Sequence, residues 1–302
     1  MNNKVRSSSF DEYKKKVAQQ YTEEWEYWKN VYNGKRISCK EGDDVLYAQR
    51  RDIILRLVDD FADNRMLKII DVGCGTGVLV NCLLERGHSV VGIDISDKMV
   101  EVAQKAADEL FPGKAMCSVG DIESLSFKDS TFDVVIAAGV LSHQLDDLLS
   151  VRELKRIVRS DGIVIITLPN RLKLKYLLDP YYYYLVFVRT LRRLIFRKNE
   201  ENTSSGFTMF MKSNSISVRK YYYGQLNPLF RKNGLQVRRT ISCGFGPLTF
   251  FGKNVLNPDR WAKFSDRLKA LADIKLFYFL NYFSTFWVIQ LNRFTVGDGC
   301  VE

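Results

Sequence analysis

Three glycines at alternate positions, Gly73, Gly75 and Gly77, follow a short apolar stretch that leads into Asp71. Glycine lacks a Cβ, so it adopts backbone angles closed to other residues and lets a ligand approach the main chain. Apolar residues resume at helical spacing from Val78, and the first N–H groups of that helix would face the same space. The stretch therefore predicts a buried strand, a glycine-rich turn and a helix that form a cofactor cradle.

Two further carboxylates occupy equivalent positions. Asp94 ends the next apolar segment, and Asp121 follows the one after it. Open parallel sheets bind ligands at the carboxyl ends of their strands, so we expect Asp71, Asp94 and Asp121 along one edge. The dinucleotide fingerprint Gly-x-Gly-x-x-Gly would need its third glycine at Val78, so the cradle is not of that type.

The residues are positioned by strands that alternate with helices, as the spacing of the apolar residues indicates. Strands are expected at 67–70, 89–93, 114–119, 132–138 and 163–167. Amphipathic helices are expected at 10–33, 45–61, 79–85, 97–110 and 145–159, with a turn at 160–162. Ser96 is placed to cap the helix at 97–110. Almost wholly apolar strands that alternate with helices indicate the α/β class, with a parallel sheet covered on both faces.

The pattern changes after residue 170. Residues 171–198 are basic, aromatic and helical in character, and 198–214 are polar, as in a linker. Further elements are a helix at 221–233, a strand at 235–242, a helix at 258–279 and a strand at 284–291. We divide the chain into an N-terminal helical cap (1–45), a cofactor-binding core (46–170), a basic aromatic lid inserted after the fifth strand (171–222) and a C-terminal completion of the sheet (223–302).

Five sequence blocks occur in an order typical of one enzyme family. They are Ile-Ile-Asp-Val-Gly-Cys-Gly-Thr-Gly at 69–77, Val-Gly-Ile-Asp-Ile-Ser at 91–96 with Met99, Gly-Asp-Ile-Glu at 120–123, Phe-Asp-Val-Val at 132–135 and Arg-Ser-Asp-Gly at 159–162. Over about residues 65–170 the chain resembles the class I S-adenosylmethionine-dependent methyltransferases. The resemblance implies a Rossmann-like, seven-stranded sheet with helices on both faces.

The resemblance also implies roles for the acids. Asp94 would accept both ribose hydroxyls of S-adenosylmethionine, Asp121 would accept from the adenine amino group with Ile122 beside the ring, and Asp71 would meet the methionine ammonium. The structural alternative for each acid is a turn residue or a helix cap. The predicted cofactor-binding residues are Asp71, Gly73, Cys74, Gly75, Gly77, Asp94, Ile95, Met99, Asp121, Ile122 and Ala138.

His143 follows the fourth predicted strand at the same edge and is the predicted catalytic base, because imidazole works near neutral pH. The alternative is a histidine that only caps or packs. Methyltransferases of the quinone-biosynthesis O-methylating type often carry a Glu-His pair here, whereas this chain has Ser142 before the histidine. Six scattered cysteines and two histidines add no ligand pattern, so we predict no metal and reduced thiols.

The net charge of +10 is concentrated in the lid, where residues 171–198 contain eight lysines or arginines and one aspartate. Arg189, Arg192, Arg193 and Arg197 recur at helical spacing beside apolar and aromatic residues. Such a basic amphipathic helix fits an anionic membrane surface, a phosphate-bearing lipid or nucleic acid, and also fits a solvated helix that packs on the core. Its apolar run is too short to span a bilayer.

We therefore predict a methyltransferase that acts on a small, lipophilic or aromatic acceptor, most readily at oxygen. The N-terminal aromatic helix and residues 171–222 would cover the acceptor, or the helix would simply pack on the core. The likeness to quinone and tetrapyrrole methylating enzymes is loose. Alternatives are an RNA methyltransferase that uses the basic segment 171–198, and a non-catalytic cofactor-binding subunit. The polar N-terminal stretch lacks an apolar signal region, so we expect a cytoplasmic location, with peripheral membrane contact as a further prediction.

Overall fold

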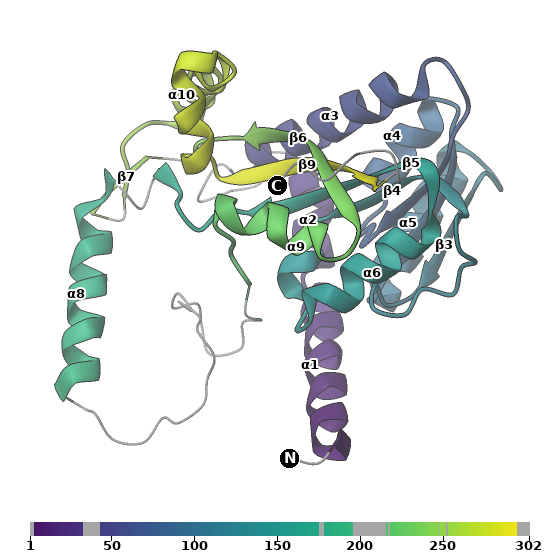
Figure 1. Cartoon of the computed structure of the whole chain (residues 1–302), viewed down its shortest axis with the longest axis horizontal. Coiled ribbons are helices and arrows are strands. Elements are labelled where there is room, and N and C mark those ends of the chain that lie inside the picture. Colours follow the sequence, from purple (N-terminus) through teal and green to yellow (C-terminus); the bar gives the residue numbers. More distant parts are fainter. Residues whose placement is uncertain are drawn as a thin grey trace.

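The computed structural model describes residues 3–32, 43–174, 178–195, 216, 218–246, 248–251 and 253–294. At its centre is a seven-stranded sheet with the order β3-β2-β1-β4-β5-β9-β6 (Figure 1). The strands are β1 (Lys68–Val72), β2 (Ser89–Asp94), β3 (Ala115–Val119), β4 (Phe132–Ala138), β5 (Val158–Pro169), β6 (Leu235–Cys243) and β9 (Phe286–Arg293). The first five are parallel, while β9 lies antiparallel between β5 and β6. The predicted seven-stranded, Rossmann-like sheet is thus confirmed.

Helices flank both faces of this sheet (Figure 1). The α-helices are α1 (Asn3–Glu23), α2 (Trp25–Tyr32), α3 (Asp43–Ala62), α4 (Val78–Glu85), α5 (Asp97–Leu110), α6 (Asp147–Ile157), α8 (Pro180–Ile195), α9 (Leu226–Arg231) and α10 (Pro258–Ala272). Short 3₁₀ helices are η1 (Leu141–His143), η2 (Tyr223–Gln225) and η3 (Lys275–Phe283). The predicted cap is confirmed, because the Ser96 side chain accepts a hydrogen bond from the Met99 N–H.

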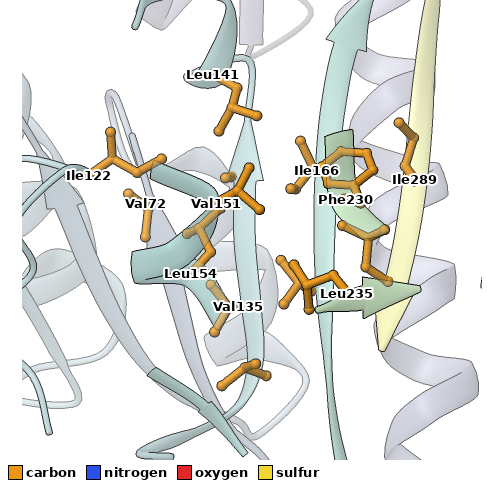
Figure 2. Packing of buried hydrophobic residues seen from close by; sticks show 14 of the residues in the cluster. Val72, Ile122, Val135, Leu141, Val151, Leu154, Ile166, Phe230, Leu235 and Ile289 are labelled. Atoms are coloured by element: carbon orange, nitrogen blue, oxygen red, sulfur yellow. The ribbon is translucent and has the colours of Figure 1, made fainter. Parts of the chain in front are cut away.

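Alternate residues of each central strand enter different cores. Ile69 of β1 and Ile165 of β5 pack with α3, α4 and α5, whereas the neighbouring Ile70 and Ile166 pack with α6 and α9. Figure 2 shows the second cluster, in which α6, α9 and η1 cover one face of the sheet. Because side chains alternate across a strand, a sheet buried on both faces needs apolar residues at successive positions. This requirement explains the continuous apolar strands.

Several predicted boundaries are wrong. The helix predicted at 10–33 is two helices, since a turn at Glu24 separates α1 from α2. The turn predicted at 160–162 is a bulge inside β5, where the pairing passes from Phe132–Val158 to Val134–Ile163. The helix predicted at 258–279 ends at Ala272, because the buried Asn281 side chain donates to the Ala272 carbonyl and a 3₁₀ helix follows.

The region after β5 forms helix α8, which stands beside the sheet at the left of Figure 1. Tyr183, Tyr184 and Phe187 on this helix are each more than half exposed. The predicted linker at 198–214 lies outside the described residues. A short hairpin of β7 (Thr249–Phe250) and β8 (Lys253–Asn254) was not predicted, since two-residue strands have no periodicity.

Candidate donor and acceptor site

The glycine-rich turn joins β1 to α4, and all three glycines have left-handed backbone angles, with φ of 77°, 53° and 79° at Gly73, Gly75 and Gly77. A Cβ at Gly77 would lie 2.9 Å from the Cα of Ala103, and one at Gly73 would lie 2.0 Å from a methyl carbon of Val140. A Cβ at Gly75 would meet no atom within 4 Å. Two glycines therefore permit packing, while the third faces open space, as a ligand cradle requires.

Asp94 at the end of β2 is held by the same turn. Its Oδ2 accepts a hydrogen bond from the Gly75 N–H at 2.9 Å, and its Oδ1 accepts from the Ser96 N–H at 2.9 Å. Burial raises the pKa of Asp94, and the backbone N–H groups of Ser96 and Gly75 oppose that rise. Each carboxylate oxygen has a second lone pair, so this fixed carboxylate can still accept two hydroxyl donors.

Asp71 is buried in β1 and its Oδ1 has no hydrogen-bond partner among the described residues. Burial and the neighbouring Asp94 raise the pKa of Asp71 to about 7, while Arg50 opposes the rise. Together with Tyr47, Arg50, Gly73, Cys74 and Ala138, Asp71 lines a cavity of about 40 Å³. An unsatisfied buried carboxylate in a cavity suits a cationic group, and the ammonium of S-adenosylmethionine is such a group.

Asp121 lies after β3 and pairs with a residue that the sequence did not reveal. The Lys14 ammonium of α1 forms ion pairs with the carboxylates of Asp121 and Glu123. The Glu123 N–H also donates to Asp121 Oδ1 at 3.0 Å. Ile122 between them is 3% exposed and packs in the core of Figure 2, so its predicted contact with adenine stays a prediction.

The other predicted cofactor residues surround the same turn. The Cys74 N–H donates to the Ile93 carbonyl at 2.9 Å, and a hydrogen bond with Cys117, together with burial, raises the pKa of the Cys74 thiol. Met99 is buried and its N–H donates to Ser96 Oγ at 3.2 Å, which makes it part of the helix cap. Ile95 is half-buried between Asp94 and that cap.

His143 ends η1, just beyond the carboxyl end of β4. Its Nε2 lies 2.9 Å from the Tyr21 hydroxyl of α1, and the two rings meet edge to face with centroids 5.6 Å apart. Nδ1 is buried and has no hydrogen-bond partner among the described residues. Burial lowers the pKa of His143 to about 4, so the imidazole is neutral near pH 7.

Helix α1 contacts both His143 and the helix cap next to Asp94. Thr22, the residue after Tyr21, has its Oγ1 2.8 Å from Ser96 Oγ, and Ser96 in turn donates its N–H to Asp94. Adjacent residues on one helix thus contact His143 and the cap beside Asp94. The predicted base and the predicted ribose-binding acid are therefore connected through one helix.

A second polar cluster near η1 was missed by sequence reasoning. Arg219 pairs with Asp147 at 2.6 Å, and the buried Tyr221 hydroxyl donates to the same carboxylate at 3.1 Å. The Arg219 N–H also donates to the Ser142 carbonyl at 2.8 Å. This cluster fixes the C-terminal end of the predicted lid against η1. Nothing in the sequence pairs these residues, because Asp147 lies in the core before the lid and the other two lie at the far end of the lid.

Comparison with known proteins identifies the domain. Residues 70–166 match the family model described as a methyltransferase domain. Residues 70–166 form a methyltransferase domain. Its fold is similar to that of a solved methyltransferase.

Matching sequences include quinone-modifying enzymes. Ubiquinone biosynthesis O-methyltransferase from Bos taurus, a mitochondrial protein, is 34% identical over 135 residues, which cover 42% of this chain and 36% of that protein. The enzyme of the same name from Azorhizobium caulinodans is 36% identical over 105 residues, covering 35% of this chain and 41% of that one. The chain thus spans about two fifths of the length of these relatives.

Solved structures match over more of the chain. Magnesium protoporphyrin IX methyltransferase from Synechocystis PCC 6803, with bound SAH, gives a TM-score of 0.58 at 16% identity and covers 92% of this chain and 98% of that one. At this identity the likeness establishes the fold of the methyltransferase domain together with its flanking elements.

Proposed function

We propose that the protein transfers the methyl group of S-adenosylmethionine to an oxygen atom of a small, lipophilic acceptor. The observation that carries this proposal is the line of contacts from Asp94 through Ser96, Thr22 and Tyr21 to His143. This line of contacts supports a role for the neutral imidazole next to the proposed donor site. The ubiquinone O-methyltransferases that match the domain support oxygen as the methylated atom.

The residues present fit the donor. When bound, S-adenosylmethionine supplies an activated methyl group. Asp94 would hold the ribose hydroxyls, the unsatisfied Asp71 would hold the ammonium, and Asp121 would hold the adenine amino group. The open space over Gly75 leaves room for the ligand beside the backbone. Alignment of donor and acceptor in a dry pocket supplies much of the rate of methyl transfer.

His143 would remove the proton from the acceptor hydroxyl. Its depressed pKa keeps the ring unprotonated over the physiological range, so one ring nitrogen has a lone pair to face the hydroxyl proton. Helix α1 covers the imidazole, since Tyr21 lies against the edge of the ring, and this cover excludes water from the proton transfer.

We propose that the lid contacts both the acceptor and the membrane surface. The exposed aromatic side chains of α8 suit a lipophilic acceptor held near an anionic lipid surface. Of the arginines predicted to face lipid phosphates, Arg189, Arg192 and Arg193 lie within α8, and Arg197 lies outside the described residues. Within the described part of the chain, no helix combines the length and apolar character needed to cross a bilayer. RNA methylation, a scaffold role and a cytoplasmic location stay predictions.

Calorimetry and product analysis test the donor and base assignments. We expect S-adenosylmethionine to bind the wild-type protein and not Asp94→Ala, and we expect a methylated species by mass spectrometry when cell extract is incubated with labelled donor. His143→Ala should bind the donor normally and lose turnover by about 10²-fold or more. Equal donor affinity of Asp94→Ala and wild type would refute the donor site, and unchanged turnover of His143→Ala would refute the base.

Liposome flotation tests the membrane contact. The full chain should float with vesicles that contain anionic phospholipid, and the triple change of Arg189, Arg192 and Arg193 to serine should abolish flotation. The triple change of Arg231, Arg238 and Arg239 to serine, at exposed positions on α9 and β6, is the matched control for lost charge. Retained flotation of the triple variant would disprove the role of α8, and loss of RNA binding in its place would favour the RNA alternative.

A further inference from the structure

One face of helix α1 contacts several residues of the candidate site. Lys14 meets Asp121 and Glu123, Tyr21 meets His143 and Thr22 meets Ser96. Spacings of seven and eight residues place these side chains on one side of the helix. The helix is therefore held at both ends of the site, and the Tyr21 hydroxyl has a fixed position relative to the imidazole.

The two nitrogens of His143 differ in their surroundings. A neutral imidazole carries one N–H donor and one lone pair, and the partner of one nitrogen decides which atom holds the proton. Nε2 faces the Tyr21 hydroxyl at 2.9 Å, whereas buried Nδ1 has no hydrogen-bond partner among the described residues. A base must present its lone pair to the acceptor, and Nδ1 is the nitrogen that protein groups leave available.

We propose that Tyr21 is a positioning residue whose hydroxyl accepts a hydrogen bond from Nε2–H of His143 and thereby leaves the Nδ1 lone pair for the acceptor proton. This inference rests on the proposed O-methyltransferase function. The acceptor O–H bond breaks, its proton forms the new Nδ1–H bond, and the electron pair stays on the acceptor oxygen. That oxygen would form a bond to the methyl carbon of the donor while the methyl–sulfur bond breaks and its electron pair stays on the sulfur. The imidazolium that forms keeps its Nε2–H bond to Tyr21.

The chain offers an internal reference for the tautomer. It has only two histidines, His88 and His143. The Nδ1 of His88 lies 3.4 Å from the Leu67 N–H and accepts from it, so the proton of His88 is on Nε2. Labelling the full chain with ¹⁵N-histidine therefore gives two imidazole spin systems, which the spectrum of His143→Ala assigns.

Tyr21→Phe is the test variant, because it keeps the ring against the imidazole and removes only the hydroxyl. Tyr27→Phe, a 47% exposed tyrosine of α2, is the matched control. In wild type and in Tyr27→Phe we expect His143 to hold its proton on Nε2, like His88. In Tyr21→Phe we expect a mixture of both tautomers and a turnover lowered by about tenfold, a part of what a general base contributes.

Two results would overturn the proposal. One is a wild-type spectrum with the His143 proton on Nδ1, and the other is a Tyr21→Phe variant with unchanged tautomer and unchanged turnover. The spectrum needs neither donor nor acceptor, so it is independent of the proposed function. A wild-type protein with the expected tautomer that fails to bind S-adenosylmethionine would refute the proposed function and leave the Tyr21–His143 geometry intact.

Discussion

The donor side and the lid are built in opposite ways. On the donor side, Asp94 accepts hydrogen bonds from main-chain N–H groups of the glycine turn and of the next helix cap, and its neighbours are buried or half-buried. In the lid, the aromatic side chains of α8 are largely exposed. Backbone geometry thus shapes the proposed donor site, whereas the proposed acceptor surface depends on side chains that pack against little else. We therefore expect the donor side to tolerate few substitutions and the lid to tolerate many.

The largest expected effect comes from Asp71→Asn. The pKa of Asp71 is about 7 in the folded protein and 3.8 ordinarily, so ionisation disfavours folding as pH rises from 4 to 7. Removing the charge should raise the free energy of unfolding by up to about 4 kcal/mol at pH 8 and leave it unchanged at pH 4. Urea denaturation at both pH values measures this, with the exposed Asp108→Asn as control.

Asp71→Asn should lower the affinity for S-adenosylmethionine, because the ammonium group of the donor loses its carboxylate partner. Calorimetry would therefore show a more stable protein that binds S-adenosylmethionine less tightly. A variant that is destabilised at pH 8, or that binds the donor as well as wild type, would contradict the assignment of Asp71.

The next largest effect on stability is expected at the glycine turn, where two substitutions can be compared. Gly77→Ala forces a left-handed residue against the main chain of Ala103 and should lower the free energy of unfolding by about 3 kcal/mol. Gly75→Ala faces open space, so only about 1 kcal/mol of backbone strain is expected, together with weakened donor binding. Chemical denaturation compares the two, and equal losses would show that the turn does not pack as described.

Loss of the Lys14 ion pairs of helix α1 should have a smaller effect on stability. Lys14→Met removes the ion pairs with Asp121 and Glu123. At a partly exposed site these pairs contribute at most about 1 kcal/mol to the free energy of unfolding. We expect faster amide hydrogen exchange within α1 and little change elsewhere. Lys16→Met, which loses an exposed pair with Glu12, is the control. Unchanged exchange in Lys14→Met would mean that other contacts hold the helix.

The smallest effect on stability is expected in the lid. Phe187 is 65% exposed, so Phe187→Ser should change the free energy of unfolding by less than about 0.5 kcal/mol. Phe230→Ala in the buried cluster should lose about 3–5 kcal/mol by the same measurement. A large loss of unfolding free energy in Phe187→Ser would show that α8 packs on the body of the protein.

The sequence predicted the parts of this molecule that depend on local spacing. The strand at 132–138, the helix at 97–110 and its Ser96 cap are confirmed, because apolar period and capping chemistry act over a few residues. The contacts of Lys14 and Tyr21 could not be predicted, since periodicity says which face of a helix is apolar and not where that face docks. The bulge at 160–162 was missed for a similar reason. Its Gly162 is required by the close approach of the Asp133 carbonyl, which belongs to another strand.

The position of β9 has a consequence for biosynthesis. This strand pairs with β5 from Ile163–Asn292 to Pro169–Phe286, and it separates β5 from β6. Residues 162–169 of β5 are buried in the finished sheet, yet their neighbour is translated last among the described strands. While residues 170–285 are being made, the nascent chain carries an open, apolar strand edge, the kind that pairs with other chains. Aggregation during synthesis is therefore expected to depend on how quickly the ribosome completes the second half of the protein.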